Sequence, residues 1–536
     1  MSLFDRHRAR LDVALDAIAR GGVAVAPPTA ELDAAAEAAF RRLLGSSFAL
    51  PEATGEARLG AERSPWGLDL AITYPTATPA SWLQAAATVR AEWAGAAIER
   101  RVGVLLEALA RLEADAGRLA HAVAHTTGQP TAMAFATSGP TGFARALEAT
   151  AQAYAAVKRV PPPERRPAAG EGAAGRTVER RWRVVPRGTA LVVATATSPW
   201  EAAAAGLFAS LATGHPVLVK PNPTAVLPLA LVVAALRGVL AEDGLPADVV
   251  QLCVDSADAP VTKMLARDPA VRVVDYAGGR GFADWLERNA HQARLHLETP
   301  GLNPVVIDGG DDLDALYHHL AGVLVRHAGQ TVTAPRVIFV PGDGVRSRGG
   351  RQAFEAVAQG LAAAIDDVLA EAGAVGDRLG ALRSEATLDA VRAAQPLGRI
   401  VREARRIEAP GWPRARTVSP LVLTTHAGRE RDYAEPRVAP VAFVVATDDS
   451  AESIERAVHG VNRHGAAIAR VHSANDHVLE AAADAFAQAG VPVSCNVTGG
   501  EEPGATLAAT GHLGLRDPDF VAGRFRVVGV DRALEP

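Results

Sequence analysis

The sequence predicts an α/β protein built around parallel sheets with covered faces. Short runs of mostly β-branched residues recur after residue 189, and helical segments fill much of the sequence between them. This rhythm is typical of folds that bind dinucleotides at the carboxyl ends of their strands. A chain of 536 residues with 49% hydrophobic and 21% charged residues is also long enough to bury a large core.

The N-terminal third is predicted to be helical. Apolar positions recur at helical spacing in the first 60 or so residues, and a second helical block runs from residue 82 to residue 112 before a turn-like segment at 125–130. Residues 161–175, rich in Pro, Gly, Ala and Arg, predict an exposed connection. Polar and apolar residues alternate along 177–185, which predicts a strand with one solvent-exposed face.

Two series of buried strands follow. The first series is predicted at 190–196, 216–219, 249–254, 271–276 and 305–308. The second series is predicted at 336–340, 421–424, 441–445, 466–472 and 492–496. No internal repeat is evident, so the two series are not copies of one unit.

Composition excludes several functional classes. The chain has 55 Lys and Arg against 60 Asp and Glu, and no basic stretch is interleaved with aromatic residues, so a nucleic-acid partner is not expected. No apolar run is long enough for a membrane span, and the N-terminus does not read as a signal peptide. Two cysteines, Cys253 and Cys495, are interpreted as packed thiols in a cytoplasmic protein, and no metal site is predicted.

One ordered set of motifs carries more specific information. Residues 186–193 lead into Pro199-Trp200, then a helix ending in Ala-Thr-Gly, then a strand ending in Lys220-Pro221. This order resembles the cofactor domain of the aldehyde dehydrogenase superfamily. The resemblance implies that the ammonium group of Lys220 hydrogen-bonds the adenosine ribose of NAD or NADP, although an isolated Lys would be read as a surface residue.

Two further segments match the superfamily. Residues 274–283 fall where the family has a turn that approaches the cofactor pyrophosphate; Gly278 is kept, and Gly279 stands in place of a Ser. Residues 298–307 match the segment that carries the general base, so the resemblance assigns this role to Glu298. Partial burial would raise the pKa of this carboxyl and suit it to accept a proton near neutral pH.

The nucleophile segment departs from the family pattern. Gly329 and Gln330 are kept, but Val332 stands at the position of the catalytic Cys, at the usual spacing from Glu298. A valine side chain cannot form the thiohemiacetal and thioester of the family's covalent route. The sequence therefore predicts impaired covalent chemistry.

Two more positions differ. Glu201 follows Trp200 where the superfamily usually has an Asn that donates to the oxyanion, and a carboxylate there would repel that charge. The Glu that holds the nicotinamide ribose in the family corresponds to Pro436, with Glu435 displaced by one residue. Glu435 is predicted to compensate only if the loop has shifted.

Segments outside the common core resemble the PaaN-type aldehyde dehydrogenases of phenylacetate degradation, which implies a CoA-linked semialdehyde as substrate. These segments are 3–7, 121–129, 183–188, 206–214 and 525–528. The implied parts are an N-terminal helical extension at 1–66, a Rossmann-type dinucleotide-binding domain at 67–176 and 186–299, an α/β catalytic domain at 300–500, and bridging segments at 177–185 and 501–536. Such bridging strands pair across subunits, which predicts a homodimer or a dimer of dimers.

Two functional hypotheses remain open. The first is an NAD(P)-dependent oxidoreductase that acts on an aldehyde by a non-covalent route, in which Glu298 deprotonates an aldehyde hydrate while hydride leaves. The second is a non-catalytic pseudoenzyme, a ligand-binding or assembly subunit that keeps the fold and a pocket for an aldehyde or an acyl-CoA-type ligand.

Overall fold

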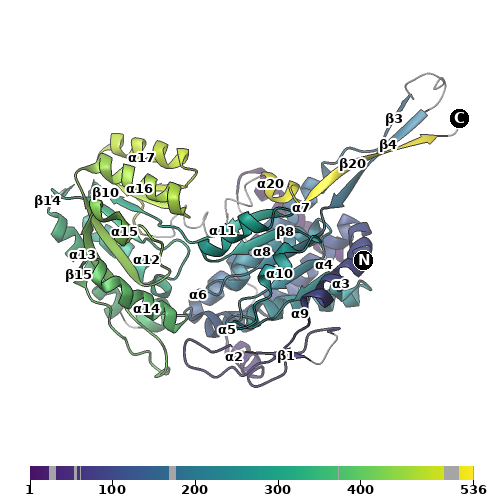
Figure 1. Ribbon diagram of the computed structural model, residues 1–536, viewed down its shortest axis with the longest axis horizontal. Helices are drawn as coiled ribbons and strands as arrows, with labels where there is room; N and C mark the ends of the chain where they lie inside the picture. The colour runs from purple at the N-terminus through teal and green to yellow at the C-terminus, as the bar shows by residue number, and fades with distance from the viewer. Residues whose placement is uncertain are drawn as a thin grey trace.

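The computed structural model describes residues 1–22, 32–53, 57–60, 62–167, 177–371, 373–499 and 518–534. Figure 1 shows two lobes side by side, with a long β-arm projecting from one of them near the C-terminal end. Residues 168–175 of the predicted connection and 501–517 of the predicted bridging segment lie outside the described residues.

The N-terminal third is helical, as its apolar spacing predicts. Its helices are α1 (Leu3–Ala19), α2 (Ala34–Arg41), α3 (Pro79–Gly95), α4 (Ile98–Ala114), α5 (Ala116–Thr127), α6 (Thr131–Ala136) and α7 (Gly142–Lys158), and a short ladder pairs β1 (Arg58–Leu59) with β2 (Tyr74–Pro75). Ser2 begins α1 with a capping box that it forms with Asp5. Helix α1 packs against α4 and α7, and its Phe4 and Leu11 are buried in the core of the first lobe. The N-terminal segment thus shares that core.

The first lobe contains a five-stranded sheet in the order β7-β6-β5-β8-β9, with every pair parallel. The strands are β5 (Thr189–Val193), β6 (Val217–Lys220), β7 (Val250–Leu252), β8 (Val271–Ala277) and β9 (Arg294–Glu298), and the helices between them are α8 (Pro199–Ala212), α9 (Leu227–Glu242), α10 (Thr262–Arg267) and α11 (Arg280–Asn289). The chain builds outwards from β5 in one direction and from β8 in the other. The connections that follow these two strands therefore diverge, which is where sheets of this type bind ligands.

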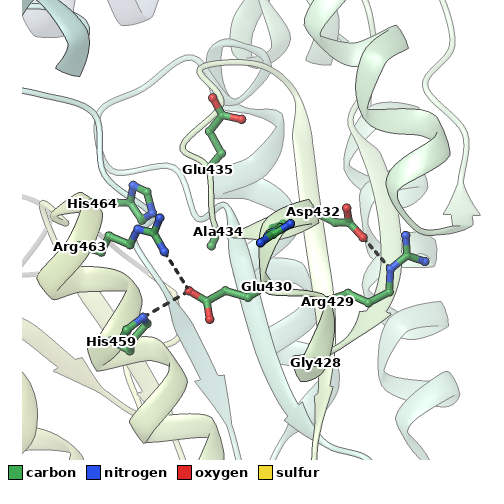
Figure 2. A pocket seen from close by; sticks show the side chains of 10 residues that line it. Gly428, Arg429, Glu430, Asp432, Ala434, Glu435, His459, Arg463 and His464 are labelled. Atoms are coloured by element: carbon green, nitrogen blue, oxygen red, sulfur yellow. Dashed lines mark ion pairs between the residues drawn. The ribbon is translucent and has the colours of Figure 1, made fainter.

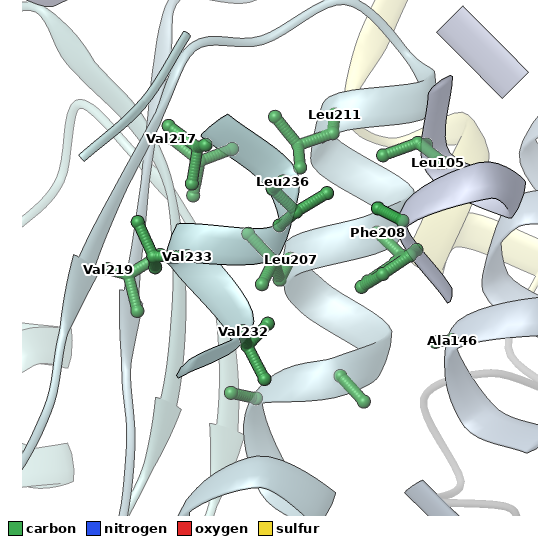
Figure 3. Packing of buried hydrophobic residues seen from close by; sticks show 14 of the residues in the cluster. Leu105, Ala146, Leu207, Phe208, Leu211, Val217, Val219, Val232, Val233 and Leu236 are labelled. Atoms are coloured by element: carbon green, nitrogen blue, oxygen red, sulfur yellow. The ribbon is translucent and has the colours of Figure 1, made fainter. Parts of the chain in front are cut away.

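The core between the sheet and the N-terminal helices is apolar and closely packed. Figure 3 shows Leu207 of α8 close to Val232 and Val233 of α9, with Val219 of β6 beside Val233 and Phe208 of α8 on the opposite side of Leu207. All five side chains are fully buried or nearly so. This packing fixes α8, whose first turn faces the functional site.

The second lobe contains a seven-stranded sheet in the order β15-β16-β17-β12-β10-β18-β19, parallel except for β15. Its strands are β10 (Val305–Ile307), β12 (Val337–Pro341), β15 (Arg399–Arg402), β16 (Leu421–His426), β17 (Val441–Thr447), β18 (Ala469–His472) and β19 (Val493–Cys495). Its helices are α12 (Leu313–Val325), α13 (Phe354–Ala370), α14 (Glu385–Ala394), α15 (Glu430–Tyr433), α16 (Ser450–His464) and α17 (Asp476–Gln488). A small sheet joins β11 (Gly309–Gly310), β13 (Val345–Ser347) and β14 (Gly350–Gln352).

The buried strands appear where the sequence predicts them, and this confirms the α/β fold class. Two strands of the two large sheets, β9 and β15, were not predicted from the sequence, and both lie at the edges of their sheets. Edge strands need only one covered face, so charged residues such as those of Arg294–Glu298 interrupt the apolar run that identifies a buried strand.

The projecting arm is a three-stranded antiparallel sheet in the order β20-β4-β3. Its strands are β3 (Glu164–Pro167), β4 (Thr177–Pro186) and β20 (Phe525–Leu534), and β20 follows the short helix α20 (Pro518–Ala522). The predicted exposed connection is therefore wrong for residues 164–167, which pair with β4 although all four are exposed. Their side chains carry no apolar pattern, so only the neighbouring strand reveals them.

Candidate active site

A cleft of about 820 Å³ lies where the carboxyl ends of the first sheet face the second lobe. Six of the seven predicted site residues line it: Lys220, Gly278, Gly279, Glu298, Gln330 and Val332. The first four come from the ends of β6, β8 and β9 or the turns after them, and the last two from the loop before β12. Parallel strands place their carboxyl ends at one edge, which is why residues far apart in the chain meet here.

Lys220 is the last residue of β6, and its side chain is 3% exposed. Its ammonium group forms an ion pair with Asp255 at 2.6 Å and donates to the carbonyl of Pro221 at 2.5 Å. Asp255 also lines the cleft, and it accepts a hydrogen bond from the backbone N–H of Val261. The pair presents a donor and an acceptor side by side, which suits a hydroxyl-rich ligand.

Gly278 and Gly279 form the turn between β8 and α11. Gly279 precedes α11 without any side-chain cap, and a Cβ atom added at Gly279 would meet nothing within 4 Å. The hydroxyl of Tyr276 donates to the Gly279 carbonyl at 2.9 Å and fixes the turn. An open approach to an uncapped helix N-terminus, within a lined cleft, fits the phosphate groups of a dinucleotide.

Glu298 is the last residue of β9, so its carboxyl lies at the end of a strand. Burial raises the pKa of its carboxyl to about 8; the positive charge of Arg145 opposes this shift, and the carboxylates of Glu201 and Asp275 add to it. Glu298 is therefore mostly protonated at neutral pH and gains its negative charge in mildly alkaline solution.

This proton should be visible in the stability of the fold. A carboxyl with a pKa of about 8 when folded and 4.5 ordinarily binds its proton more tightly in the folded state. Its favourable contribution is complete below pH 4.5 and is lost as the pH rises towards 8. We expect Glu298→Gln to raise the urea midpoint at pH 8.5 relative to wild type and to change it little at pH 5. Equal effects at both pH values would contradict the raised pKa.

The loop that carries Val332 is held in an unusual backbone conformation. His327, Ala328 and Gly329 have φ values of 49°, 48° and 62°, so three consecutive residues are left-handed. Left-handed backbone is unfavourable for non-glycine residues and persists where the surroundings impose it. Here the guanidinium of the buried Arg336 donates to the carbonyls of Gly329 and Thr331.

The side chains of this loop differ in burial and in hydrogen bonding. Gln330 is buried, and its amide donates to the carbonyls of His327 and Ala381 and accepts from the backbone N–H of Arg383. This geometry gives Gln330 a positioning role. The Val332 side chain, in contrast, is 40% exposed, while its carbonyl accepts from Asn303 at 2.7 Å.

Neither cysteine lines the cleft. Cys253 is fully buried, and its surroundings raise the pKa of its thiol. Cys495 ends β19 in the second lobe, where partial burial raises the pKa of its thiol as well. A raised pKa lowers the thiolate fraction, so neither thiol is activated as a nucleophile.

Arg145, which the sequence did not predict as a site residue, pairs with Glu201 beside Glu298. Arg145 of α7, whose side chain is 3% exposed, donates to the backbone carbonyl of Glu201 at 2.9 Å. Its second terminal nitrogen lies 3.9 Å from the Glu201 carboxyl. Burial raises the pKa of Glu201, and Arg145 opposes the shift. Arg145 belongs to no motif, so only the packing of α7 on α8 reveals it.

Glu435 lies apart from the other predicted residues. It lines a neighbouring pocket of about 760 Å³ between α15 and the end of α16, and its carboxyl is 3.6 Å from Arg437. Figure 2 shows Glu435 on the loop above this pocket, whose centre is occupied by the ion pairs of Glu430 with His459 and Arg463. The expected compensation for Pro436 is therefore not seen in this arrangement.

The sequence profile of the aldehyde dehydrogenase family matches residues 65–510, which includes both sheets and every lining residue of the cleft except Phe520. The chain belongs to the aldehyde dehydrogenase family. This membership explains why strand ends from both lobes meet at one cleft. It confirms the superfamily resemblance, while the closer resemblance to PaaN-type enzymes stays a prediction.

Similar proteins support the same assignment. The structure is similar to that of an NAD-dependent aldehyde dehydrogenase from Burkholderia multivorans, with a TM-score of 0.95, 36% identity and full coverage of both chains. An NADP-dependent glyceraldehyde-3-phosphate dehydrogenase from Bacillus halodurans, at 16% identity over 89% of this chain and 96% of that one, shares the fold with a TM-score of 0.65. The N-succinylglutamate 5-semialdehyde dehydrogenase of Paraburkholderia xenovorans is 28% identical over 48% of this chain. That alignment spans 50% of the relative's length.

The described residues offer neither a metal-binding cluster nor a membrane-spanning helix. No group of three or more His, Cys, Asp or Glu side chains in this part of the chain is arranged to hold a metal ion. Among the same residues, no helix has both the length and the apolar character to cross a bilayer.

Proposed function

We propose that this aldehyde dehydrogenase family protein binds NAD or NADP and acts as an oxidoreductase on an aldehyde or CoA-linked semialdehyde, related to the PaaN-type enzymes, with impaired covalent chemistry. The observation that carries the proposal is the shared cleft, which is lined by the strand ends of the first sheet, by Glu298 and by Val332. The relationship to PaaN-type enzymes rests on the sequence segments outside the common core.

The residues at the strand ends suit the cofactor. Lys220 and Asp255 would hold ribose hydroxyls, and the open turn at Gly279 would admit the phosphates beside α11. When bound, the cofactor supplies the acceptor for a hydride. The chain itself supplies binding groups, a partly enclosed site and one titratable carboxyl.

Because position 332 is a valine and carries no thiol, the proposed reaction uses acid–base chemistry and no covalent intermediate. Water adds to an aldehyde to give a hydrate with two O–H groups. The carboxylate of Glu298 accepts a proton from one of them, and that oxygen's electron pair becomes the new C=O as the hydride departs. Because the pKa of Glu298 is about 8, its basic form predominates only above that pH.

Single-turnover measurements test this function. Purified protein at excess over NAD and an aldehyde or CoA-linked semialdehyde should form NADH slowly, at a rate that increases with pH through a midpoint at about 8, levels off above it and is lost in Glu298→Gln. Binding of cofactor and aldehyde without NADH formation would instead favour the non-catalytic, ligand-binding alternative, for which the valine at position 332 is the specific observation.

Cofactor affinity is expected to be weaker than that of a working dehydrogenase. Gly279 offers no hydroxyl, Glu435 lines another pocket, and two or three lost hydrogen bonds correspond to about 2–4 kcal/mol. Calorimetry should give a Kd weaker than micromolar, and Gly279→Ser should tighten binding by roughly tenfold by returning one hydrogen bond.

The matched control is Gly281→Ser, because a side chain at Gly281 also meets nothing within 4 Å. It should leave the Kd unchanged. Micromolar affinity in the wild type, or equal effects of both substitutions, would contradict this interpretation of the turn.

We also propose a homodimer or a dimer of dimers that pairs through the β-arm. Val185, Val527, Val528 and Val530 on the arm are each 42–43% exposed. Val185, Val528 and Val530 share one face of the antiparallel sheet and Val527 lies on the other. Exposed apolar side chains on a projecting sheet suit burial against a second copy. Light scattering at several concentrations would measure the assembly.

A further inference from the structure

Arg383 is a cation in the cleft whose charge has no acidic partner among the described residues. It follows the second-lobe turn that ends at Gly380 and lines the cleft together with Gln330 and Val332. Its Nε atom is buried and has no hydrogen-bond acceptor there. Burial lowers the pKa of the guanidinium, and no carboxylate acts to raise it.

The backbone of Arg383 is held firmly on both sides. Its N–H donates to the Gln330 side chain at 3.0 Å, and its carbonyl accepts from the guanidinium of Arg416 at 2.8 Å. Gln330 in turn anchors the loop of Val332. The side chain of Arg383 therefore enters the cleft that Val332 also lines, from a backbone that is held on both sides.

The other charges that line the cleft largely compensate one another. Lys220 is paired with Asp255 at 2.6 Å, and Arg145 lies 3.9 Å from Glu201. Glu298 is mostly neutral below pH 8. The remaining unbalanced charge is the guanidinium of Arg383, so the cleft favours a ligand with one negative charge.

We propose that Arg383 is a specificity-determining residue that binds a carboxylate on the substrate, so that the cleft takes aldehydes that carry a carboxyl group. A guanidinium offers a planar pair of N–H donors that matches the two oxygens of a carboxylate. A cation beside Val332 would orient such a substrate with its aldehyde inside the cleft. This inference rests on the proposed function for the identity of the reacting group.

Binding can be measured without cofactor and without turnover. We would titrate wild-type protein calorimetrically with two matched pairs: succinic semialdehyde against butanal, and 4-carboxybenzaldehyde against methyl 4-formylbenzoate. The charged member of at least one pair should bind roughly 10- to 100-fold more tightly, as expected for hydrogen bonds to a charged group. Equal binding within both pairs would overturn the proposal.

Substitutions test whether Arg383 causes the preference for the charged aldehyde. Arg383→Gln should remove the preference for the charged aldehyde, Arg383→Lys should keep part of it, and Arg431→Gln, which removes a cation from the neighbouring pocket, should keep all of it. Because the fixed contacts of Arg383 are made by its backbone, the side-chain substitutions should leave the urea midpoint nearly unchanged. A full preference in Arg383→Gln would overturn the assignment.

Two further results separate this inference from the proposed function. Inorganic phosphate should compete poorly with the charged aldehyde, and tighter binding of phosphate than of either carboxylate would overturn the carboxylate assignment. A carboxylate preference that depends on Arg383, combined with no NADH in single-turnover experiments, would overturn the oxidoreductase and leave the binding site standing.

Discussion

Replacing Val332 by Cys is expected to create a reactive thiol in the cleft. Val332 is 40% exposed there, and Glu298, the proposed base, lines the same cavity. Iodoacetamide should therefore modify the variant at position 332, and a suitable aldehyde should form a covalent adduct. Intact-protein and peptide mass spectrometry would measure both. The wild type is the control, because its buried Cys253 should react slowly.

The new thiol alone is expected to give poor turnover. The resemblance implies that Glu201 stands at the position of the oxyanion donor, and the absence of one such donor costs roughly 100- to 1,000-fold in rate. We expect NADH formation to increase from wild type to Val332→Cys, and again in Val332→Cys combined with Glu201→Asn. This order would mean that the site is disabled at two points.

Glu201→Asn alone is the matched control for the double variant. It should not increase turnover, because an amide cannot substitute for the thiolate. Its urea midpoint must also be measured, since removing the carboxyl leaves the buried Arg145 without its acidic neighbour. Robust wild-type turnover that Glu298→Gln abolishes would overturn this account and establish a mechanism independent of Cys.

The largest effect on stability is expected from the buried ion pair of Arg524 with Asp275. Arg524 is fully buried before β20 and donates to both oxygens of Asp275 in β8, at 2.8 and 2.6 Å, and to the Ser210 hydroxyl at 2.7 Å. Arg524→Met would leave a buried carboxylate without its partner. Removal of one member of a buried pair typically costs about 3–5 kcal/mol.

Urea unfolding would measure this cost. Arg524→Met combined with Asp275→Asn should recover part of the lost stability, because the second change removes the unpaired charge. Arg348→Met is the surface control, since its ion pair with Asp311 is well exposed and should contribute little. Similar midpoints for Arg524→Met and Arg348→Met would contradict the structural role of the pair.

The pair also has a predictable pH dependence. Burial raises the pKa of Asp275, but the charge and hydrogen bonds of Arg524 outweigh it and lower the pKa below 3.8. A lowered folded-state pKa contributes stability above the ordinary value, and this contribution is lost as the pH falls. In Arg524→Met, burial is no longer opposed by Arg524 and raises the pKa of Asp275, so the variant's carboxyl takes up a proton before that of the wild type and the difference in stability should shrink as the pH falls.

The sequence alone determined the fold class and most of the buried strands. These features depend on local composition, because a strand covered on both faces must be apolar at nearly every position, as in Val217–Lys220. The motif order also predicted Lys220, Gly278, Glu298 and Val332 as residues of one site, and their shared cleft follows from the strand ends of the family fold. The edge strands β9 and β15 were not predicted because an edge strand has only one partner strand and can carry charged residues, which interrupt the apolar run that identifies a buried strand.

The tertiary structure alone decided which charges meet. Arg145, Arg383 and Arg524 stand in no motif, and each acts on residues far away in the chain: Arg145 on Glu201, Arg383 beside the Gln330 loop, and Arg524 on Asp275. It also decided that Glu435 faces a different pocket and that the Gln330 amide holds backbone. The physical reason is that the pKa and the energetic effect of a charged side chain depend on its burial and its partners. Both arise only when distant segments pack together.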